Sequence, residues 1–126
     1  MHWFSIAIAL LAALGIIAIG GMYLWNPRAA TPSFGLPLPE AEANIAWWLR
    51  LKGVRDIVSG LVVLALMVWG GPRTLGLVLL IEAIIPVGDM SLILAAKGST
   101  GRALGMHGLT AALMVLAAIP LMTGAA

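Results

Sequence analysis

The sequence predicts an all-α protein, an integral membrane bundle of four antiparallel helices in up-down order, with a proline-rich loop between the first two helices. Of the 126 residues, 62% are hydrophobic and only 10% are charged. A soluble domain of this size could not bury so much apolar surface. The apolar residues also gather into stretches of about 20 residues or more, the length that crosses a bilayer as a helix. We therefore expect one transmembrane domain over residues 1–126.

The first expected helix covers about residues 3–25. It carries no charge and has tryptophan at both ends, as an aromatic belt at the two membrane interfaces would place it. It has no basic segment before it and is too long for the apolar region of a signal peptide, so we expect a permanent helix. Ser5, Ala9 and Ala13 recur every four residues and form a ridge of small side chains, which allows another helix to pack closely.

A proline-rich segment follows, with prolines at positions 27, 32, 37 and 39. Proline fixes φ and lacks a backbone N–H group, so the pattern predicts a loop over residues 27–39. Phe34, Leu36 and Leu38 alternate with these prolines, which favours a loop that lies against the bundle. Such a loop could cap a cavity.

Three further helices are expected over about residues 41–69, 74–96 and 103–122. The second begins after Pro39 with Glu40 and Glu42 in its first turn, where carboxylates interact well with the helix dipole. Glycine and proline at positions 70–72 predict a tight turn before the third helix, and residues 97–102 form another before the fourth.

Four helices place both termini on the same side of the membrane. Arg28, Lys97 and Arg102 fall in the first and third loops, whereas Arg73 alone marks the second loop. The positive-inside rule therefore places loops 1 and 3 in the cytoplasm and both termini outside, and we expect a bacterial inner membrane. The same pattern explains the net charge of +2 without any binding to nucleic acid.

Two acidic residues, Glu82 and Asp89, lie inside the otherwise apolar third helix. Seven residues apart, they share one helix face. Ionisable groups at membrane depth cost a few kcal/mol on insertion scales and indicate a functional site. Pro86 lies between them and has no N–H group to donate to the carbonyl of Glu82, which leaves that acceptor free and favours a kink beside a polar cavity.

The second helix carries a polar stripe that should find its partners in the bundle interior. We expect Arg55 and Asp56 to face inward, with Asp56 near the depth of Asp89, so that Arg55 can bridge two or three carboxylates. The candidate catalytic residues are Arg55, Asp56, Glu82 and Asp89. The candidate substrate-binding residues are Asn44, Trp48, Lys52, Ser59 and His107.

Each of these residues also has a purely structural interpretation. The charged groups could form an ion network that fixes helix register. Lys52, Lys97 and Arg102 fit cationic anchors that reach the lipid headgroups, and Trp48 fits the aromatic belt. His107 could be a hydrogen-bond partner in helix packing. The chain has no cysteine and two histidines, so we expect neither a metal nor a cofactor.

The segment KGVRDIVSGL at residues 52–61 resembles a family of small four-helix membrane proteins catalogued as domain of unknown function 4267. The Asn-Pro-Arg exit at residues 26–28 and the acidic third helix are also similar, so the resemblance covers most of the chain. It implies a four-helix membrane fold and an important Arg-Asp pair. It implies no particular activity.

Three functions fit these residues. The first is an enzyme that uses carboxylates as acid and base on a lipophilic small molecule, by epoxide opening, cyclisation or isomerisation, with the Arg55-paired carboxylate as base and Glu82 as acid. Its residue types, though not its fold, are similar to the Asp-Arg-Asp site of limonene epoxide hydrolase. The second is a proton-coupled transporter, similar in size to the small multidrug resistance proteins, which work as dimers. In that family the membrane glutamate lies in the first helix, which is uncharged here. The third is a noncatalytic subunit or assembly factor.

Overall fold

The computed structural model describes residues 2–38 and 43–125, and it is all-α within these ranges. The elements are α1 (His2–Trp25), α2 (Pro27–Phe34), α3 (Ala43–Trp69), α4 (Pro72–Glu82), α5 (Ile84–Ala95), α6 (Thr100–Arg102), the π-helical turn η1 (Ala103–Gly108) and α7 (Leu109–Thr123). Residues 39–42, where the sequence predicts the start of the second helix with Glu40 and Glu42 in its first turn, lie outside the described residues.

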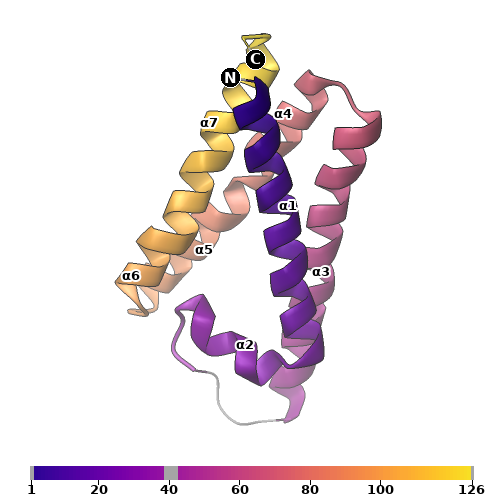
Figure 1. Ribbon diagram of the computed structural model, residues 1–126. Helices are drawn as coiled ribbons and strands as arrows, with labels where there is room; N and C mark the ends of the chain where they lie inside the picture. Colours follow the sequence, from indigo (N-terminus) through magenta and orange to yellow (C-terminus); the bar gives the residue numbers. More distant parts are fainter. Residues whose placement is uncertain (1, 39–42, 126) are drawn as a thin grey trace.

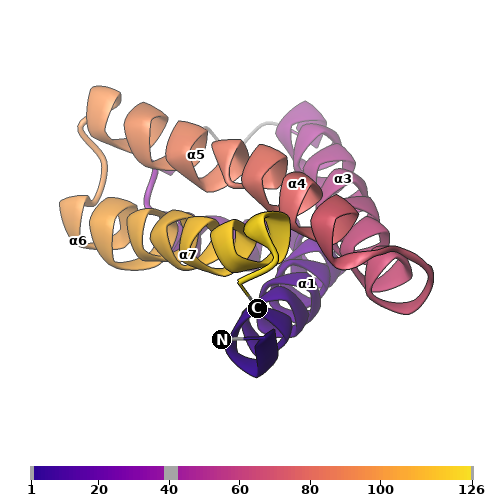
Figure 2. The same cartoon turned by 90° about the horizontal axis from the view of Figure 1, so that it is seen from above.

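Four long helical rods run up and down, and the short helix α2 lies across the gap at one end (Figure 1). The rods are α1, α3, the pair α4–α5, and the continuous run α6–η1–α7. Both termini lie at the same end of the molecule, as the even number of rods requires. Viewed from that end, α1 and α3 pair with each other, while α4–α5 and α6–α7 run alongside one another (Figure 2).

Three of these rods are long and apolar enough to cross a membrane. They are His2–Trp25, Pro72–Ala95 and Thr100–Thr123, each of 24 residues with a mean hydropathy between 1.8 and 2.4. Helix α3 is longer, at 27 residues, but it carries four charged residues in its first half and is not among the three. Length and composition of the three helices therefore indicate an integral membrane protein.

Close backbone contacts fix how α3 is rotated against α1. A Cβ atom added at Gly53 would lie 2.6 Å from the carbonyl oxygen of Gly20, and one added at Gly60 would lie 2.6 Å from the carbonyl oxygen of Ala13. Only glycine allows the two helices this approach. The predicted small-residue ridge of α1 is buried as expected, with Ser5, Ala9 and Ala13 at most 1% exposed.

The apolar core lies toward the end of the molecule that holds the termini. It consists mainly of small and branched residues from α1, α4 and α7, including Ala9, Leu79, Ala117 and Leu121. Toward the other end α1 and α7 diverge, and α2 crosses the space between them. The core thus holds the rods together at one end and leaves room for a pocket at the other.

The expectation of a loop over residues 27–39 is wrong for its first half, because residues 27–34 form helix α2. The side chain of Asn26 caps this helix by accepting from the N–H group of Ala29, and Pro27 occupies the first helical position, which needs no donor. Pro32 cannot donate to the carbonyl of Arg28, and the hydroxyl of Thr31 donates to that oxygen instead, at 3.0 Å. The Thr31 hydroxyl thus satisfies the carbonyl that Pro32 leaves without a backbone donor.

The two remaining rods are irregular where they approach α2. Helix α4 ends at Glu82 and α5 begins at Ile84, so the break lies one turn before Pro86, as the missing N–H group predicts. The fourth rod begins three residues earlier than expected, since the Ser99 hydroxyl accepts from the N–H group of Arg102. It then passes through the π-helical turn η1, which holds His107 and which the sequence analysis did not predict.

Candidate functional site

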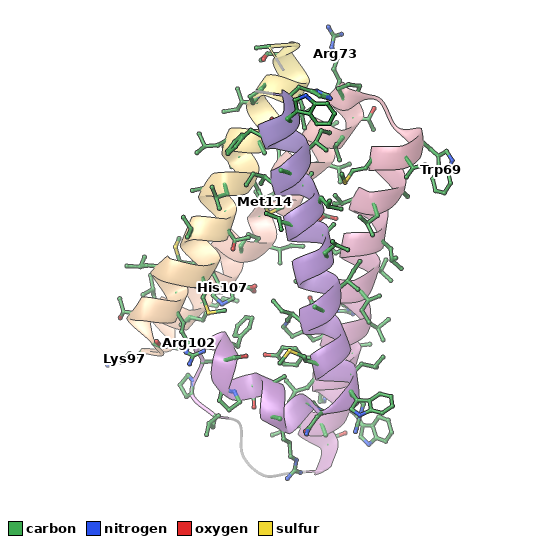
Figure 3. All side chains as sticks on the ribbon, in the orientation of Figure 1. Trp69, Arg73, Lys97, Arg102, His107 and Met114 are labelled. Carbon is green, nitrogen blue, oxygen red and sulfur yellow. The ribbon has the colours of Figure 1, made fainter. Side chains whose placement is uncertain are left out.

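A pocket of about 270 Å³ lies between the rods, and α1 to α5, η1 and α7 all contribute to it. Its walls are largely apolar, from residues such as Ile16, Ile19, Ile85 and Met114. The polar and ionisable side chains that line it are Tyr23, Ser33, Lys52, Ser59, Glu82, Asp89, His107 and Thr110. Figure 3 shows His107 on the α7 side of the gap, with Met114 higher up toward the core. An apolar pocket with a few converging polar groups is typical of a small-molecule site.

Lys52 is the cation of the pocket, and its charge is balanced by Asp56. Its ammonium group donates to Asp56 Oδ2 at 2.5 Å, four residues along the same helix. The nitrogen also lies 4.3 Å from the ring centre of Tyr23 and 5.1 Å from that of Phe34, within the range of cation–π contacts. Lys52 thus has partners inside the protein, and its assignment as a lipid-headgroup anchor stays a prediction.

His107 connects two parts of the molecule that are far apart in sequence. Its Nε2 atom lies 3.0 Å from the carbonyl oxygen of Phe34 in α2, and its Nδ1 atom lies 3.6 Å from Asp89 Oδ2 in α5. The ring is also tilted against the Phe34 ring, with 4.7 Å between their centres. The π-helical turn presents the imidazole to both partners, a use of π-helical geometry that is common at functional sites.

These contacts bear on the protons that the Asp89–His107 pair can hold. A carbonyl oxygen only accepts, so the contact with Phe34 assigns a hydrogen to Nε2. Nδ1 lies 3.6 Å from Asp89 Oδ2, which is an ion-pair distance rather than a hydrogen-bond distance. The contact is favourable when the imidazole is protonated, and in that form the pair is net neutral and has one proton that it can give away.

Glu82 lies deeper in the pocket, two helical turns from Asp89, about 10 Å along the helix axis at 1.5 Å per residue. Ser59 on α3 lines the same pocket. Among the residues that the structure describes, Glu82 has no cation within ion-pair distance. Buried Pro86 lines the same wall, so the predicted proximity of Glu82, Pro86 and Asp89 to one cavity is confirmed.

The expected central role of Arg55 is contradicted by its position. Its side chain is exposed and does not line the pocket, and Asp89 faces His107 rather than Arg55. The glycine contacts of Gly53 and Gly60 turn α3 so that Lys52 and Ser59 point inward and Arg55 points outward. The site therefore contains no Asp-Arg-Asp arrangement.

The other candidates divide in the same way. Lys52, Ser59 and His107 line the pocket, whereas Asp56 lies behind Lys52 as its partner. Asn44 and Trp48 are exposed and lie outside the pocket, so their predicted contact with a substrate has no structural support. Within residues 2–38 and 43–125, no three histidine, aspartate or glutamate side chains converge on a point that could hold a metal ion.

Sequence reasoning missed two aromatic residues of the site. Tyr23 is 2% exposed and Phe34 is half-buried, and both contact Lys52. Tyr23 is the single tyrosine of the chain and lies two residues before the end of an apolar helix, a position that is also typical of the aromatic belt. The signal for Phe34 was its place in a proline-rich segment, which suggested a cap but not a contact with a particular lysine.

Comparisons with known proteins identify the family only. No curated protein and no solved structure matches the chain. The family model described as domain of unknown function (DUF4267) matches residues 13–121, a span that contains the whole pocket apart from Leu11 and Ala12. Since the match covers most of the sequence, the chain belongs to the DUF4267 family.

Proposed function

We propose that this protein is a four-helix integral membrane enzyme that binds a lipophilic small molecule in the pocket and transfers a proton to or from it. The observation that carries the proposal is the 3.6 Å contact between Asp89 and His107 at the wall of an otherwise apolar pocket, which in its protonated form would hold one transferable proton. Glu82 supplies a second proton-transfer group on the same wall.

The size and lining of the pocket support a lipophilic ligand. A volume of about 270 Å³ is far above the roughly 10–15 Å³ that a single water molecule needs, so the pocket has room for a small molecule. The apolar side chains of α1 and α7 would hold its hydrocarbon part, while its polar or reactive part lies against α5 and η1.

The two proton-transfer groups can divide the work of one reaction. Epoxide opening, cyclisation and double-bond isomerisation each need one group that gives a proton and another that accepts one. With about 10 Å between their Cα positions along the helix, Asp89 and Glu82 can reach opposite ends of a reacting group. General acid–base catalysis of this kind contributes about 100- to 10,000-fold to a rate.

In this proposal all four rods lie in the bilayer, including α3, on which Lys52 and Ser59 line the pocket and Asp56 pairs with Lys52. In the proposed orientation the termini lie outside and the end that carries α2 lies in the cytoplasm, which the distribution of positive residues favours. A lipophilic ligand would reach the pocket from the membrane interior.

One observation also favours a second candidate, a proton-coupled transporter. The sequence placed Arg55 beside the acids, where its fixed charge would repel a cationic substrate. Because Arg55 is exposed, Glu82 has no cation within ion-pair distance among the described residues, which suits binding of a proton or a lipophilic cation in alternation.

The test is to identify the ligand and then to follow its atoms. The protein is purified in nanodiscs, copurifying small molecules are identified by mass spectrometry, and each is incubated in D₂O or H₂¹⁸O with fresh protein. The enzyme proposal expects a mass change in the molecule, slowed about 100-fold or more by Asp89→Asn, while the matched control Arg55→Gln keeps the wild-type rate. A molecule that binds at Glu82 and Asp89 but gains no isotope would refute the enzyme and leave the transporter, which a proteoliposome uptake assay under a pH gradient then tests.

A further inference from the structure

Helix α2 is fastened over the pocket by three consecutive backbone carbonyls at its C-terminal end. The Ser33 carbonyl accepts from Arg102 Nη1 at 2.7 Å, the Phe34 carbonyl accepts from His107 Nε2 at 3.0 Å, and the Gly35 carbonyl accepts from the Ser99 N–H group at 2.7 Å. These acceptors are the orphan carbonyls of a helix end, which need partners. The donors all belong to the segment from the turn after α5 to η1.

The backbone at this end of α2 is shaped for that contact. Gly35 has φ +106°, a left-handed conformation that glycine adopts without cost. A Cβ atom added at Gly98 would collide with the carbonyl oxygen of Gly35, so glycine is also required on the opposite side of the contact. Helix α2 is thus docked on a surface that accepts it closely, and Ser33 and Phe34 form part of the pocket wall.

The middle one of the three hydrogen bonds belongs to the Asp89–His107 pair. While the pair holds its shared proton, Nε2–H can donate to Phe34 and the contact between Nδ1 and Asp89 is also favourable. When the shared proton is lost, the neutral imidazole keeps a single N–H group. Two acceptors, the Asp89 carboxylate and the Phe34 carbonyl, then compete for it. A hydrogen on Nδ1 satisfies the charged carboxylate, and hydrogen bonds to charged groups are the stronger ones. Nε2 then presents a lone pair to the Phe34 carbonyl, and the contact becomes repulsive.

We propose that α2 is a lid of the pocket whose docking is linked to the shared proton of the Asp89–His107 pair, with Arg102 as a positioning residue that holds the end of α2 against His107. The lid is closed while the pair is loaded with its proton and is released when the proton leaves. This deepens the proposed function and rests on it for the role of the proton in turnover. The contact between α2 and His107 stands independently of any ligand.

Other charged groups around the pair are accounted for in this arrangement. Lys52 and Asp56 of α3 act on Asp89 electrostatically, but they neutralise one another. Arg102 of α6 is committed to the Ser33 carbonyl. Tyr23 of α1 and Glu82 of α4 line the same pocket, and neither is a partner of His107 in the described part of the chain. The switch is therefore assigned to Asp89 and His107.

The experiment measures the position of α2 without ligand, in nanodiscs, by electron–electron distance measurement between two spin labels. The chain has no cysteine, so single labels can be placed at exposed positions of α2 and η1 by Ala29→Cys and Leu104→Cys. In a series of buffers from about pH 5 to pH 8, we expect one short distance at low pH and a growing fraction of longer distances at high pH. A distance distribution that does not change with pH would overturn the proposal.

Three variants separate the linkage from a merely structural role. In Asp89→Asn the amide N–H group donates to Nδ1 in place of the shared proton, so the lid should stay closed at every pH. Arg102→Gln should raise the open fraction on the order of tenfold while keeping its pH dependence, since a charge-assisted hydrogen bond is lost but the pair remains. Arg73→Gln, at the opposite end of the molecule, should change neither (Figure 3). An Asp89→Asn protein with wild-type pH dependence would refute the linkage.

A second measurement keeps the proposal testable if a variant does not fold. The chain has only two histidines, so ¹⁵N-histidine labelling gives a simple spectrum in which His107 is identified by comparison with His2→Gln. A closed lid requires hydrogen on Nε2, and a spectrum with hydrogen on Nδ1 alone while α2 is docked would overturn the proposal. Neither measurement uses a ligand. The lid proposal can therefore be refuted while isotope incorporation supports the enzyme proposal, and the lid proposal can be supported while the enzyme proposal is refuted.

Discussion

The contact between α1 and α3 provides the most direct test of why this pocket has its particular lining. Replacing Gly60 by alanine would place the new Cβ atom 2.5 Å from Ile17 Cγ1 and 2.6 Å from the carbonyl oxygen of Ala13. The side chain could move aside, but the carbonyl belongs to the backbone of α1. The helices must therefore separate by several tenths of an ångström at least, and they cannot do so without loosening the contacts on either side.

The magnitude follows from two opposing terms. Alanine is favoured over glycine inside a helix by about 0.5–1 kcal/mol. Overpacking a close contact costs about 1–3 kcal/mol. Gly15 of α1 is the matched control, because an added Cβ atom there meets nothing within 4 Å. Gly15→Ala should be neutral or stabilising by up to about 1 kcal/mol, and Gly60→Ala should be less stable than Gly15→Ala by about 1–3 kcal/mol.

The assay is reversible unfolding in mixed micelles, with the fraction of denaturing detergent as the variable and circular dichroism and tryptophan fluorescence as two readouts. Both variants share the same change in composition, so the difference between their free energies of unfolding isolates the helix contact. A Gly60→Ala protein within a few tenths of a kcal/mol of Gly15→Ala would refute the argument that this contact fixes the rotation of α3. It would also remove the physical reason given for the outward position of Arg55.

Three further predictions follow from the same geometry. Arg55→Gln should change the free energy of unfolding less than Asp56→Asn does in the same unfolding assay, because Arg55 forms no ion pair among the described residues. Gly98→Ala should loosen the docked end of α2 and increase hydrogen exchange of its amides, whereas Gly101→Ala, with the nearest atom at 4.0 Å, should not. Asp56→Asn should destabilise by about 1–3 kcal/mol, because it leaves the Lys52 charge unpaired in a half-buried site, and adding Lys52→Met should restore most of that loss in a double-mutant cycle.

The helical rods could be predicted from the sequence because the composition and length of an apolar stretch are averages over many residues. The four rods, the common end for both termini and the break before Pro86 were all predictable in this way. The break follows from a single missing N–H group, an effect that does not depend on tertiary context. The position of Glu82 and Asp89 on one pocket wall follows from their spacing of seven residues.

Arg55 shows where such reasoning fails. A helical wheel gives the angles between residues but not the rotation of the helix against its neighbours. Arg55 and Lys52 belong to the same polar sector of the helical wheel. This sector is too wide for both side chains to face the pocket, so only one of them can do so. Gly53 and Gly60 decide between them, since these glycines must face α1. Their seven-residue spacing is visible in the sequence, and treating it as the contact face would have turned Arg55 outward.

His107 shows a second limit. The π-helical turn from Ala103 to Gly108 changes the angular position of everything after it, and no composition signal marks it. The contact with the Phe34 carbonyl also depends on α2, a segment whose prolines led to the prediction of a loop. The cap at Asn26 and Pro27 did carry a helix-start signal, because an amide side chain followed by proline suits the first positions of a helix.

The irregular parts of the backbone meet at the pocket, and this is the strongest physical argument that the pocket is more than a packing defect. The break at Ala83, the π-helical turn and the open end of α2 each free backbone polar groups, which are costly to leave unsatisfied where water is scarce. Two of these three irregular parts involve His107. The π-helical turn contains this residue, and the open end of α2 contacts its ring through the Phe34 carbonyl. A defect in packing would be relieved by larger apolar side chains. Here the space is instead lined by Ser59, Glu82 and Asp89, whose burial among apolar side chains is unfavourable, and this supports the proposal that a ligand or a proton is handled there.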